Sequence, residues 1–220
     1  MKRIIDIVIS ELTLAILFPL IVFISLIIII TSPGPVLYKG LRIGLRGQPF
    51  MIYKFRTMVQ DAERLGGPST SDDDPRLTSI GKFIRKFKLD EIPQLFNVLK
   101  GEMSLVGPRP EVVSEVDLED IDQKKILGVK PGITDFASLW DVNEGEILKG
   151  AADAHEAYKK YIKPTKRVLQ LKYIEEMSLL LDFKIMIYTL IRILNKRWVP
   201  PEIRGFAPPS VPIKEKTIDR

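Results

Sequence analysis

The sequence predicts an α+β fold that is mostly helical, and three observations point to it. An uncharged apolar segment at Leu12–Ile30 is typical of a membrane helix. Two short strand-like segments flank a turn-rich stretch at Gly44–Gly47, which favours a small β-hairpin. Apolar residues recur with helical spacing over 80–87 and over much of 158–198. The spacing over 80–87 predicts an amphipathic helix at the membrane surface or on the core. The spacing over 158–198 predicts core-packed or interfacial helices.

The apolar N-terminal segment is long enough to cross a bilayer. Nineteen helical residues from Leu12 to Ile30 would extend roughly 28 Å, close to the hydrocarbon thickness. Phe18-Pro19 lies inside the segment, and a proline there removes a backbone hydrogen bond and kinks a helix. Basic residues occur on both sides of the segment, so the positive-inside rule gives it no orientation. A re-entrant helix, which enters and leaves through one face, would show this pattern, and a spanning helix is the alternative.

Changes in composition divide the chain into three regions. The stretch Ser32-Pro-Gly-Pro35 ends the apolar helix and turns the chain. Prolines become frequent after Trp198, which is typical of an extended tail. We therefore expect a membrane helix with a break near Pro19, one main domain, and a proline-rich extended tail, at 1–31, 32–198 and 199–220 respectively.

The charge composition restricts the function classes. The chain has 33 Lys and Arg against 28 Asp and Glu, a formal net charge of +5. This excess suits an anionic membrane surface, a phosphorylated substrate or a nucleic acid. The absence of cysteine excludes disulfides and thiolate metal sites. The single histidine, His155, rules out a histidine-rich zinc site and disfavours a His-based triad.

Two cations follow each other on the second predicted strand. Phe50–Phe55 reads as a strand, and Lys54 and Arg56 are two residues apart. Side chains at that spacing share one face of a strand, so the pair could bind a diphosphate. A solvated strand face is the alternative.

Adjacent carboxylates at Asp90 and Glu91 begin the most distinctive stretch of the chain. Asp90 fits the N-cap of a short buried helix through Leu95–Leu99, with Pro93 in the first turn and Gly101 at the end. A helix N-terminus attracts phosphate, and a carboxylate pair beside a phosphate suggests a divalent cation. Neighbouring helical residues point about 100° apart, so one carboxylate could bind a metal while the other attacks. The alternative is a capping aspartate followed by a solvated glutamate.

Arg109 lies between two prolines in Gly107-Pro-Arg-Pro110. Pro108 and Pro110 fix their own φ angles, and Pro110 disfavours the helical region for Arg109. A preorganised guanidinium can bind phosphate with two hydrogen bonds, whereas an arginine in a surface turn is the alternative.

Five motifs occur in an order that resembles the bacterial sugar transferase family, the monotopic phosphoglycosyl transferases. Together they cover about 85 residues, and the similarity extends from the first apolar segment to about residue 195. The motifs are Phe50-Met-Ile-Tyr-Lys-Phe-Arg-Thr-Met58, Asp74-Pro-Arg-Leu-Thr-Ser-Ile-Gly81, Leu89-Asp-Glu-Ile-Pro-Gln94, Lys100-Gly-Glu-Met-Ser-Leu-Val-Gly-Pro-Arg-Pro110 and Lys130-Pro-Gly-Ile-Thr134. The chain is similar to the small single-domain members. It departs from the usual motif over 135–146, so no role there is transferred from the family.

The resemblance implies a membrane enzyme with a cytosolic active site and a re-entrant anchor. Such an enzyme transfers a sugar-1-phosphate from a UDP-sugar to polyprenol (undecaprenyl) phosphate, releases UMP and uses Mg²⁺. On the matching residues, Asp90 is expected to attack phosphorus and form an aspartyl-phosphosugar intermediate, and Glu91 to ligate Mg²⁺. Arg109, with Lys54 and Arg56, is expected to bind phosphate oxygens.

The resemblance also implies the bacterial cytoplasmic (inner) membrane and its lipid, with the catalytic domain on the cytoplasmic face, in glycoconjugate synthesis. A non-catalytic membrane-anchored binding protein is the alternative, although it does not explain the clustered motifs. No nucleic acid is expected, because the basic helix carries an apolar face and no recognised nucleic-acid motif occurs. The sequence is compatible with a homo-oligomer and does not name the sugar.

Overall fold

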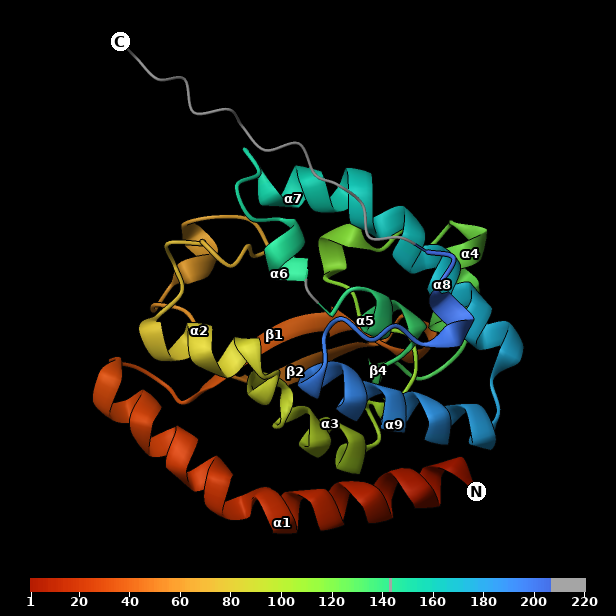
Figure 1. Cartoon of the computed structure of the whole chain (residues 1–220), viewed down its shortest axis with the longest axis horizontal. Coiled ribbons are helices and arrows are strands. Elements are labelled where there is room, and N and C mark those ends of the chain that lie inside the picture. The colour runs from red at the N-terminus through yellow and green to blue at the C-terminus, as the bar shows by residue number, and fades with distance from the viewer. Residues whose placement is uncertain (143, 207–220) are drawn as a thin grey trace.

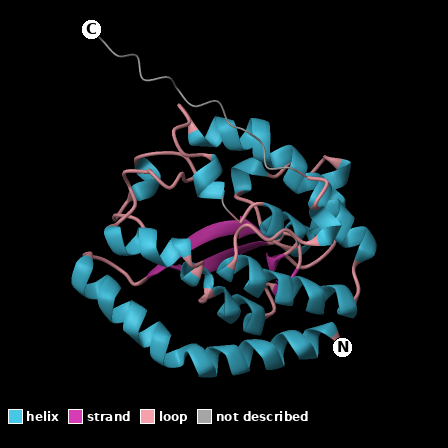
Figure 2. Ribbon diagram, in the orientation of Figure 1, coloured by secondary structure: helices cyan, strands magenta, loops and turns pink. Residues whose placement is uncertain are grey.

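The computed structural model describes residues 1–142 and 144–206. The fold is mostly helical with two small sheets, as predicted (Figure 2). Figure 1 shows α1 (Lys2–Thr31) along one side of the molecule, with α2 (Ser79–Lys86), α3 (Gln94–Lys100) and α9 (Leu179–Leu194) between it and the larger sheet. In the described part of the chain, α1 is the one helix long and apolar enough to cross a membrane.

Helix α1 runs through Pro19 without a non-helical residue, and it bends near its middle (Figure 1). A bend is expected there because Pro19 has no N–H to donate to the carbonyl of Ala15. The sequence suggested two helices separated by a break, whereas the structure has one bent helix. Whether this helix re-enters or spans a bilayer stays a prediction.

The larger sheet is the predicted hairpin. Strands β1 (Leu37–Ile43) and β2 (Pro49–Phe55) pair antiparallel, with Tyr38 opposite Lys54, around the 3₁₀ turn η1 (Leu45–Gly47). The second sheet pairs β3 (Ser104–Val106) with β4 (Gly132–Thr134) in parallel, and the sequence analysis did not predict these strands. Three-residue strands are too short for a recognisable alternation of polar and apolar residues.

The remaining helices cover the sheets. Helices α5 and α8 pack on each other, α5 also packs on α9, and Figure 1 shows α7 and α8 on the side opposite α1. The remaining α-helices are α4 (Ile121–Leu127), α5 (Phe136–Trp140), α6 (Glu144–Ile147), α7 (Ala154–Ala157) and α8 (Lys163–Glu176). The other 3₁₀ helices are η2 (Ala62–Arg64), η3 (Leu89–Glu91), η4 (Val113–Glu115) and η6 (Pro201–Ile203). The π-helix η5 (Tyr158–Ile162) leads into α8.

The packed part of the chain extends further than the predicted boundary at residue 198. Ile203 is fully buried in the main core, and the Trp140 indole donates a hydrogen bond to the carbonyl of Phe206. Burial of Ile203 stabilises η6 against the core, so residues up to 206 do not form the extended tail that their prolines suggested. The predicted tail over 207–220 lies outside the described residues.

Polar side chains attach the first turns of α1 to the domain. The Asp6 carboxylate accepts hydrogen bonds from Ser104 Oγ at 2.8 Å and from the Leu105 N–H at 3.2 Å. Lys2 forms an ion pair with Asp182 of α9, and Arg3 donates to the carbonyl at Leu99. The basic residues before the apolar segment therefore bind the protein itself and hold the start of α1 against the domain.

The second half of α1 packs on a small apolar cluster. Ile24 and Ile28 contact Phe55 at the end of β2 and Ile84 of α2. The amphipathic helix predicted around residues 80–87 is confirmed as α2, and Ile84 on its apolar face is buried. Phe83 on the same helix is 56% exposed, which leaves an apolar edge beside the membrane helix.

Candidate active site

The two adjacent carboxylates lie in a 3₁₀ turn ahead of a short helix. Lys88 adopts a left-handed conformation with φ of 56°, which turns the chain from α2 into η3. Pro93 is the N-cap residue of α3, so the expectation that Asp90 caps this helix is wrong. The reason is local: Pro93 has no N–H that a cap could bind, and helix α3 begins only after it. Asp90 and Glu91 are both buried.

Helix α3 otherwise matches the prediction, and Gly101 ends it in the left-handed conformation with φ of 85°. Phe96 is exposed, although the sequence suggested that it is buried. Asn97 is buried in its place, and its side chain accepts from the Tyr53 N–H and donates to the Met51 carbonyl. Asn97 therefore holds α3 against β2, beside Lys54, and sequence reasoning missed it because a single asparagine carries no pattern.

Glu91 is the centre of a charged group. Lys54 Nζ lies 3.1 Å from Glu91 Oε1, and Arg109 donates to both Glu91 oxygens, at 3.1 Å for Oε2. Burial alone would raise the pKa of Glu91, but the positive charges of Arg109 and Lys54 hold it well below its usual range. Glu91 is therefore an ionised carboxylate at neutral pH.

Asp90 contrasts with its neighbour. Its Oδ1 atom is buried without a hydrogen-bond partner, and Asp90 forms no ion pair within the described residues. A buried oxygen without a partner is rare in folded proteins and is a common feature of functional sites. The two carboxylates thus have different surroundings, as their angular spacing suggested.

The structure separates the two predicted cations of the second strand. Lys54 lies on β2 and reaches Glu91, but burial lowers its pKa more than the Glu91 charge raises it. Arg56 follows the end of β2, and its guanidinium donates to the carbonyls of Ser32 and Pro33, each at 2.7 Å. Arg56 therefore holds the end of α1, and the structure does not bring it to the Glu91 group. Period-2 spacing failed here because β2 ends at Phe55.

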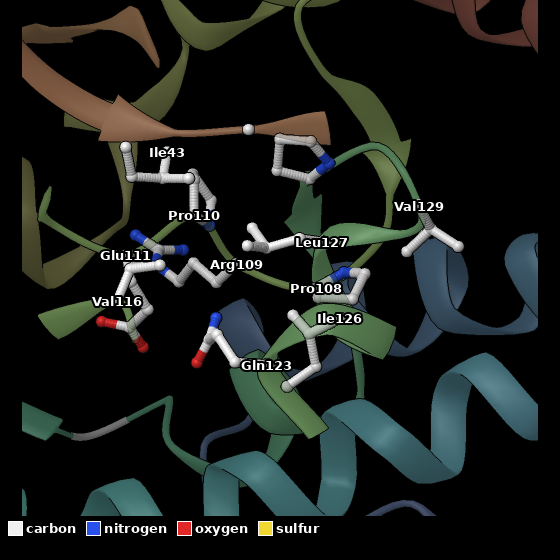
Figure 3. Close-up of a pocket in the computed structure, with 12 residues that line it drawn as sticks. Ile43, Pro108, Arg109, Pro110, Glu111, Val116, Gln123, Ile126, Leu127 and Val129 are labelled. Carbon is white, nitrogen blue, oxygen red and sulfur yellow. The ribbon is translucent and has the colours of Figure 1, made fainter. Parts of the chain in front are cut away.

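Arg109 is placed by the parallel β3–β4 pair. Its segment follows β3, where Gly107 N–H donates to the Thr134 carbonyl and Gly132 N–H donates to the Pro108 carbonyl. The Arg109 guanidinium also donates to the Ile133 carbonyl at 3.3 Å. Figure 3 shows Pro108, Arg109 and Pro110 beside a cavity that Gln123 and Ile126 also line. At about 10 Å³ this cavity is too small for a nucleotide.

The site offers oxygen ligands for one divalent cation. In the parts of the chain that the structure describes, no group of three or more acidic or histidine side chains could hold a metal by itself. Mg²⁺ commonly needs only one or two carboxylates when substrate phosphates and water supply the other ligands. The ionised Glu91 and the unpartnered Asp90 oxygen suit that donor set.

Together, these features define a class: proteins with an apolar, membrane-associating helix and a paired acidic and basic site suited to phosphorylated substrates. Comparison with known families makes the assignment specific. The family model for the bacterial sugar transferases matches residues 1–196, and the chain belongs to that family.

Relatives with described functions support this assignment. The chain is 38% identical over 198 residues to the UDP-N-acetylgalactosamine-undecaprenyl-phosphate N-acetylgalactosaminephosphotransferase of Aeromonas hydrophila, covering 88% of this chain and 44% of the relative. It is 36% identical to the UDP-glucose:undecaprenyl-phosphate glucose-1-phosphate transferase of Escherichia coli, covering 87% and 40%. It is 34% identical to the exopolysaccharide production protein ExoY of Sinorhizobium fredii, covering 86% and 83%. The chain thus spans less than half of the first two relatives and most of the third.

Proposed function

We propose that this protein transfers a sugar-1-phosphate from a UDP-sugar to polyprenol (undecaprenyl) phosphate, giving polyprenol diphosphate-sugar and UMP. Two relatives are named for reactions of this class on undecaprenyl phosphate. The observation that carries the proposal is the division between the two carboxylates: among the described residues Asp90 has no ion-pair partner, whereas Glu91 is held by Lys54 and Arg109. An unpaired carboxylate beside two cations suits nucleophilic attack on a bound phosphate.

In the first half-reaction, a carboxylate oxygen of Asp90 attacks the β-phosphorus of the UDP-sugar. A bond forms between that oxygen and phosphorus, while the bond from phosphorus to the bridging oxygen breaks. The bridging oxygen leaves on UMP with the electron pair. Arg109 and Lys54 bind phosphate oxygens at this stage, which requires them to share their hydrogen bonds between Glu91 and the substrate.

In the second half-reaction, a phosphate oxygen of the polyprenol phosphate attacks the phosphorus of the aspartyl-phosphosugar. The acyl-phosphate bond breaks, and its electron pair returns to Asp90. The product is the polyprenol diphosphate-sugar, and the carboxylate is ready for another cycle. The buried position of Asp90 excludes water, which limits hydrolysis of the intermediate.

Glu91 is the proposed ligand for Mg²⁺. When bound, the ion would neutralise charge on the two phosphates and on the departing UMP. The low pKa of Glu91 keeps it ionised for this role. The length and apolar composition of α1 support a position of this site beside a bilayer, and we propose the cytoplasmic face of the inner membrane, where a UDP-sugar and a polyprenol phosphate can meet.

The test is UMP release from a panel of UDP-sugars with Mg²⁺, measured with and without polyprenol phosphate. The proposal predicts multiple-turnover release that depends on the acceptor and is lost in Asp90→Asn and in Glu91→Gln. Exposed Glu146 gives a matched control, because Glu146→Gln changes the same chemical group at a position with no role in the proposed chemistry. Folded protein that binds UDP-sugars but releases no UMP would instead support a membrane-anchored binding protein.

A further inference from the structure

A second charged cluster adjoins the proposed site, formed by Asp141, Glu144 and Lys166. Lys166 Nζ lies 3.3 Å from Asp141 Oδ2 and 3.1 Å from Glu144 Oε2. The side chains of Asp141 and Lys166 are 3% and 7% exposed, whereas that of Glu144 is 29% exposed. The cluster therefore presents one carboxylate edge and keeps its other members buried.

The cluster lies within electrostatic range of the phosphate-binding residues. The negative charge of Glu144 is among those that raise the pKa of Arg109 against the effect of burial. The positive charge of Lys88 helps to lower the pKa of both Glu91 and Glu144, although burial opposes the shift in each. The geometry agrees with this: Gln170, one helical turn after Lys166 in α8, has its Nε2 atom 3.5 Å from the backbone carbonyl oxygen of Arg109.

Asp141 and Glu144 are two carboxyl groups that face the single ammonium group of Lys166, so their charges are not balanced if both are ionised. Asp141 Oδ1 is buried without a partner when the side chain is taken as ionised. Burial and the neighbouring Glu144 charge raise the pKa of Asp141 well above its usual range, which favours the proton on Asp141 rather than on Glu144. A protonated Asp141 can donate to Glu144, which satisfies its oxygen. Glu144 is then an ionised acceptor held by both Lys166 and Asp141.

We propose that Glu144 accepts hydrogen bonds from hydroxyl groups of the donor's transferred sugar, with Lys166 and Asp141 as positioning residues. This inference rests on the proposed function and extends it to sugar selection. The sugar is bonded to the β-phosphate, so its hydroxyl groups lie near whatever binds that phosphate. Hydroxyl groups need acceptors, and Glu144 is a carboxylate with a partly exposed edge beside Arg109. Asp90 and Glu91 already have other proposed roles, as the nucleophile and as the Mg²⁺ ligand.

The test compares Glu144→Gln with wild type on UDP-sugars that differ at one hydroxyl group, namely the C4 epimers UDP-glucose and UDP-galactose and their N-acetyl forms. We expect kcat/KM for the preferred donor to fall about tenfold, as for a lost hydrogen bond to a charged group. The ratio between epimers should shrink, while inhibition by UMP stays unchanged. Lys166→Met should reproduce this pattern, and Glu146→Gln should leave both quantities at wild-type values.

Other outcomes overturn the assignment. A uniform loss across all donors, with weaker inhibition by UMP, would place the contact on the ribose hydroxyl groups instead. Wild-type selectivity in Glu144→Gln would show that this carboxylate does not contact the substrate. Donor binding is also measured in the Asp90→Asn background, where turnover is not needed. If the wild-type protein binds UDP-sugars without turning them over, the proposed reaction fails, while the ratio of epimer affinities with and without Glu144→Gln still decides the role of Glu144; if the wild-type protein binds no UDP-sugar, both proposals fail.

Discussion

Lys54 Nζ lies 3.1 Å from Glu91 Oε1, whereas the adjacent Asp90 forms no ion pair within residues 1–142 and 144–206. Two neighbouring carboxylates in one turn therefore have opposite surroundings. An ion pair lowers the reactivity of a carboxylate by engaging its lone pairs, so the unpaired Asp90 is the better nucleophile. The structure thus supports separate roles for the two residues, and each role leads to a measurement.

Removal of the Glu91 charge should destabilise the protein. Glu91→Gln leaves Lys54 and Arg109 close together without a carboxylate, and we expect a loss of about 2 kcal/mol in the free energy of unfolding, reduced from the fully buried case by partial exposure. Denaturant unfolding in detergent measures this loss of unfolding free energy. Equal stability of Glu91→Gln and wild type would show that this group of charges contributes nothing to the fold.

The ion pairs of Glu91 with Lys54 and Arg109 predict that the stability of the protein depends on pH. The pKa of Glu91 is lower in the folded state than in the unfolded state, so its stabilising effect is present above the unfolded value of about 4.3. That contribution is lost as the pH falls through the pKa that Glu91 has in the folded protein. The difference in unfolding free energy between wild type and Glu91→Gln should therefore be constant from pH 8 to about 5 and shrink below about 4. A difference that grows on acidification would contradict the assignment.

Lys54 and Arg56 should respond differently to substitution. Lys54→Met removes a cation beside Glu91 and should weaken UDP-sugar binding about tenfold. Arg56→Gln removes hydrogen bonds to the Ser32 and Pro33 carbonyls and should lower stability by about 2 kcal/mol, with kcat/KM near wild type at a temperature where the variant is folded. Steady-state kinetics and thermal unfolding separate the two effects. Weak donor binding by a stable Arg56→Gln protein would restore Arg56 to the site.

Arg109 should not tolerate replacement by lysine. Its guanidinium contacts both Glu91 oxygens and the Ile133 carbonyl, and an ammonium cannot reproduce that planar arrangement. We expect Arg109→Lys to reduce kcat/KM for UMP release about 100-fold, whereas Arg64→Lys at an exposed position should have no effect. Near-normal activity of Arg109→Lys would mean that only its charge is used.

The β3–β4 pair that supports Arg109 should be destabilised when side-chain volume is added at Gly132. A methyl group at Gly132 would overlap with the backbone of Gly107, so Gly132→Ala should cost about 3 kcal/mol of stability. Gly205 has no atom within 4 Å of the corresponding position, and Gly205→Ala should change stability by less than about 0.5 kcal/mol. A stable Gly132→Ala protein would show that the close approach of these two strands is not required.

Local patterns in the sequence were sufficient for much of the fold. The apolar run predicted α1, the i, i+3, i+4 spacing around Ile84 predicted α2, and the turn-rich stretch after Ile43 predicted the hairpin. The three-residue strands β3 and β4 were missed because their pairing joins segments about 28 residues apart, and no local pattern reports such a contact.

The candidate site was only partly accessible to sequence reasoning. Asp90, Glu91 and Arg109 belong to dense motifs, and the structure brings Glu91, Arg109 and Lys54 together. Their catalytic roles stay predictions. Arg56 was grouped with Lys54 by their two-residue spacing alone, but β2 ends at Phe55 and Arg56 lies beyond it. The cluster of Asp141, Glu144 and Lys166 joins α8 to a segment that departs from the family motif, so neither spacing nor resemblance could indicate it.

The most direct test of the account is detection of the aspartyl-phosphosugar on Asp90. Wild-type protein is incubated with a preferred UDP-sugar and Mg²⁺ without acceptor, then analysed by intact-protein and peptide mass spectrometry. We predict a burst of about one UMP per active enzyme and a sugar-phosphate adduct on the peptide containing Asp90, which polyprenol phosphate removes. Asp90→Asn should show neither. Turnover with acceptor but no burst and no adduct would contradict covalent catalysis and favour direct transfer between the two substrates.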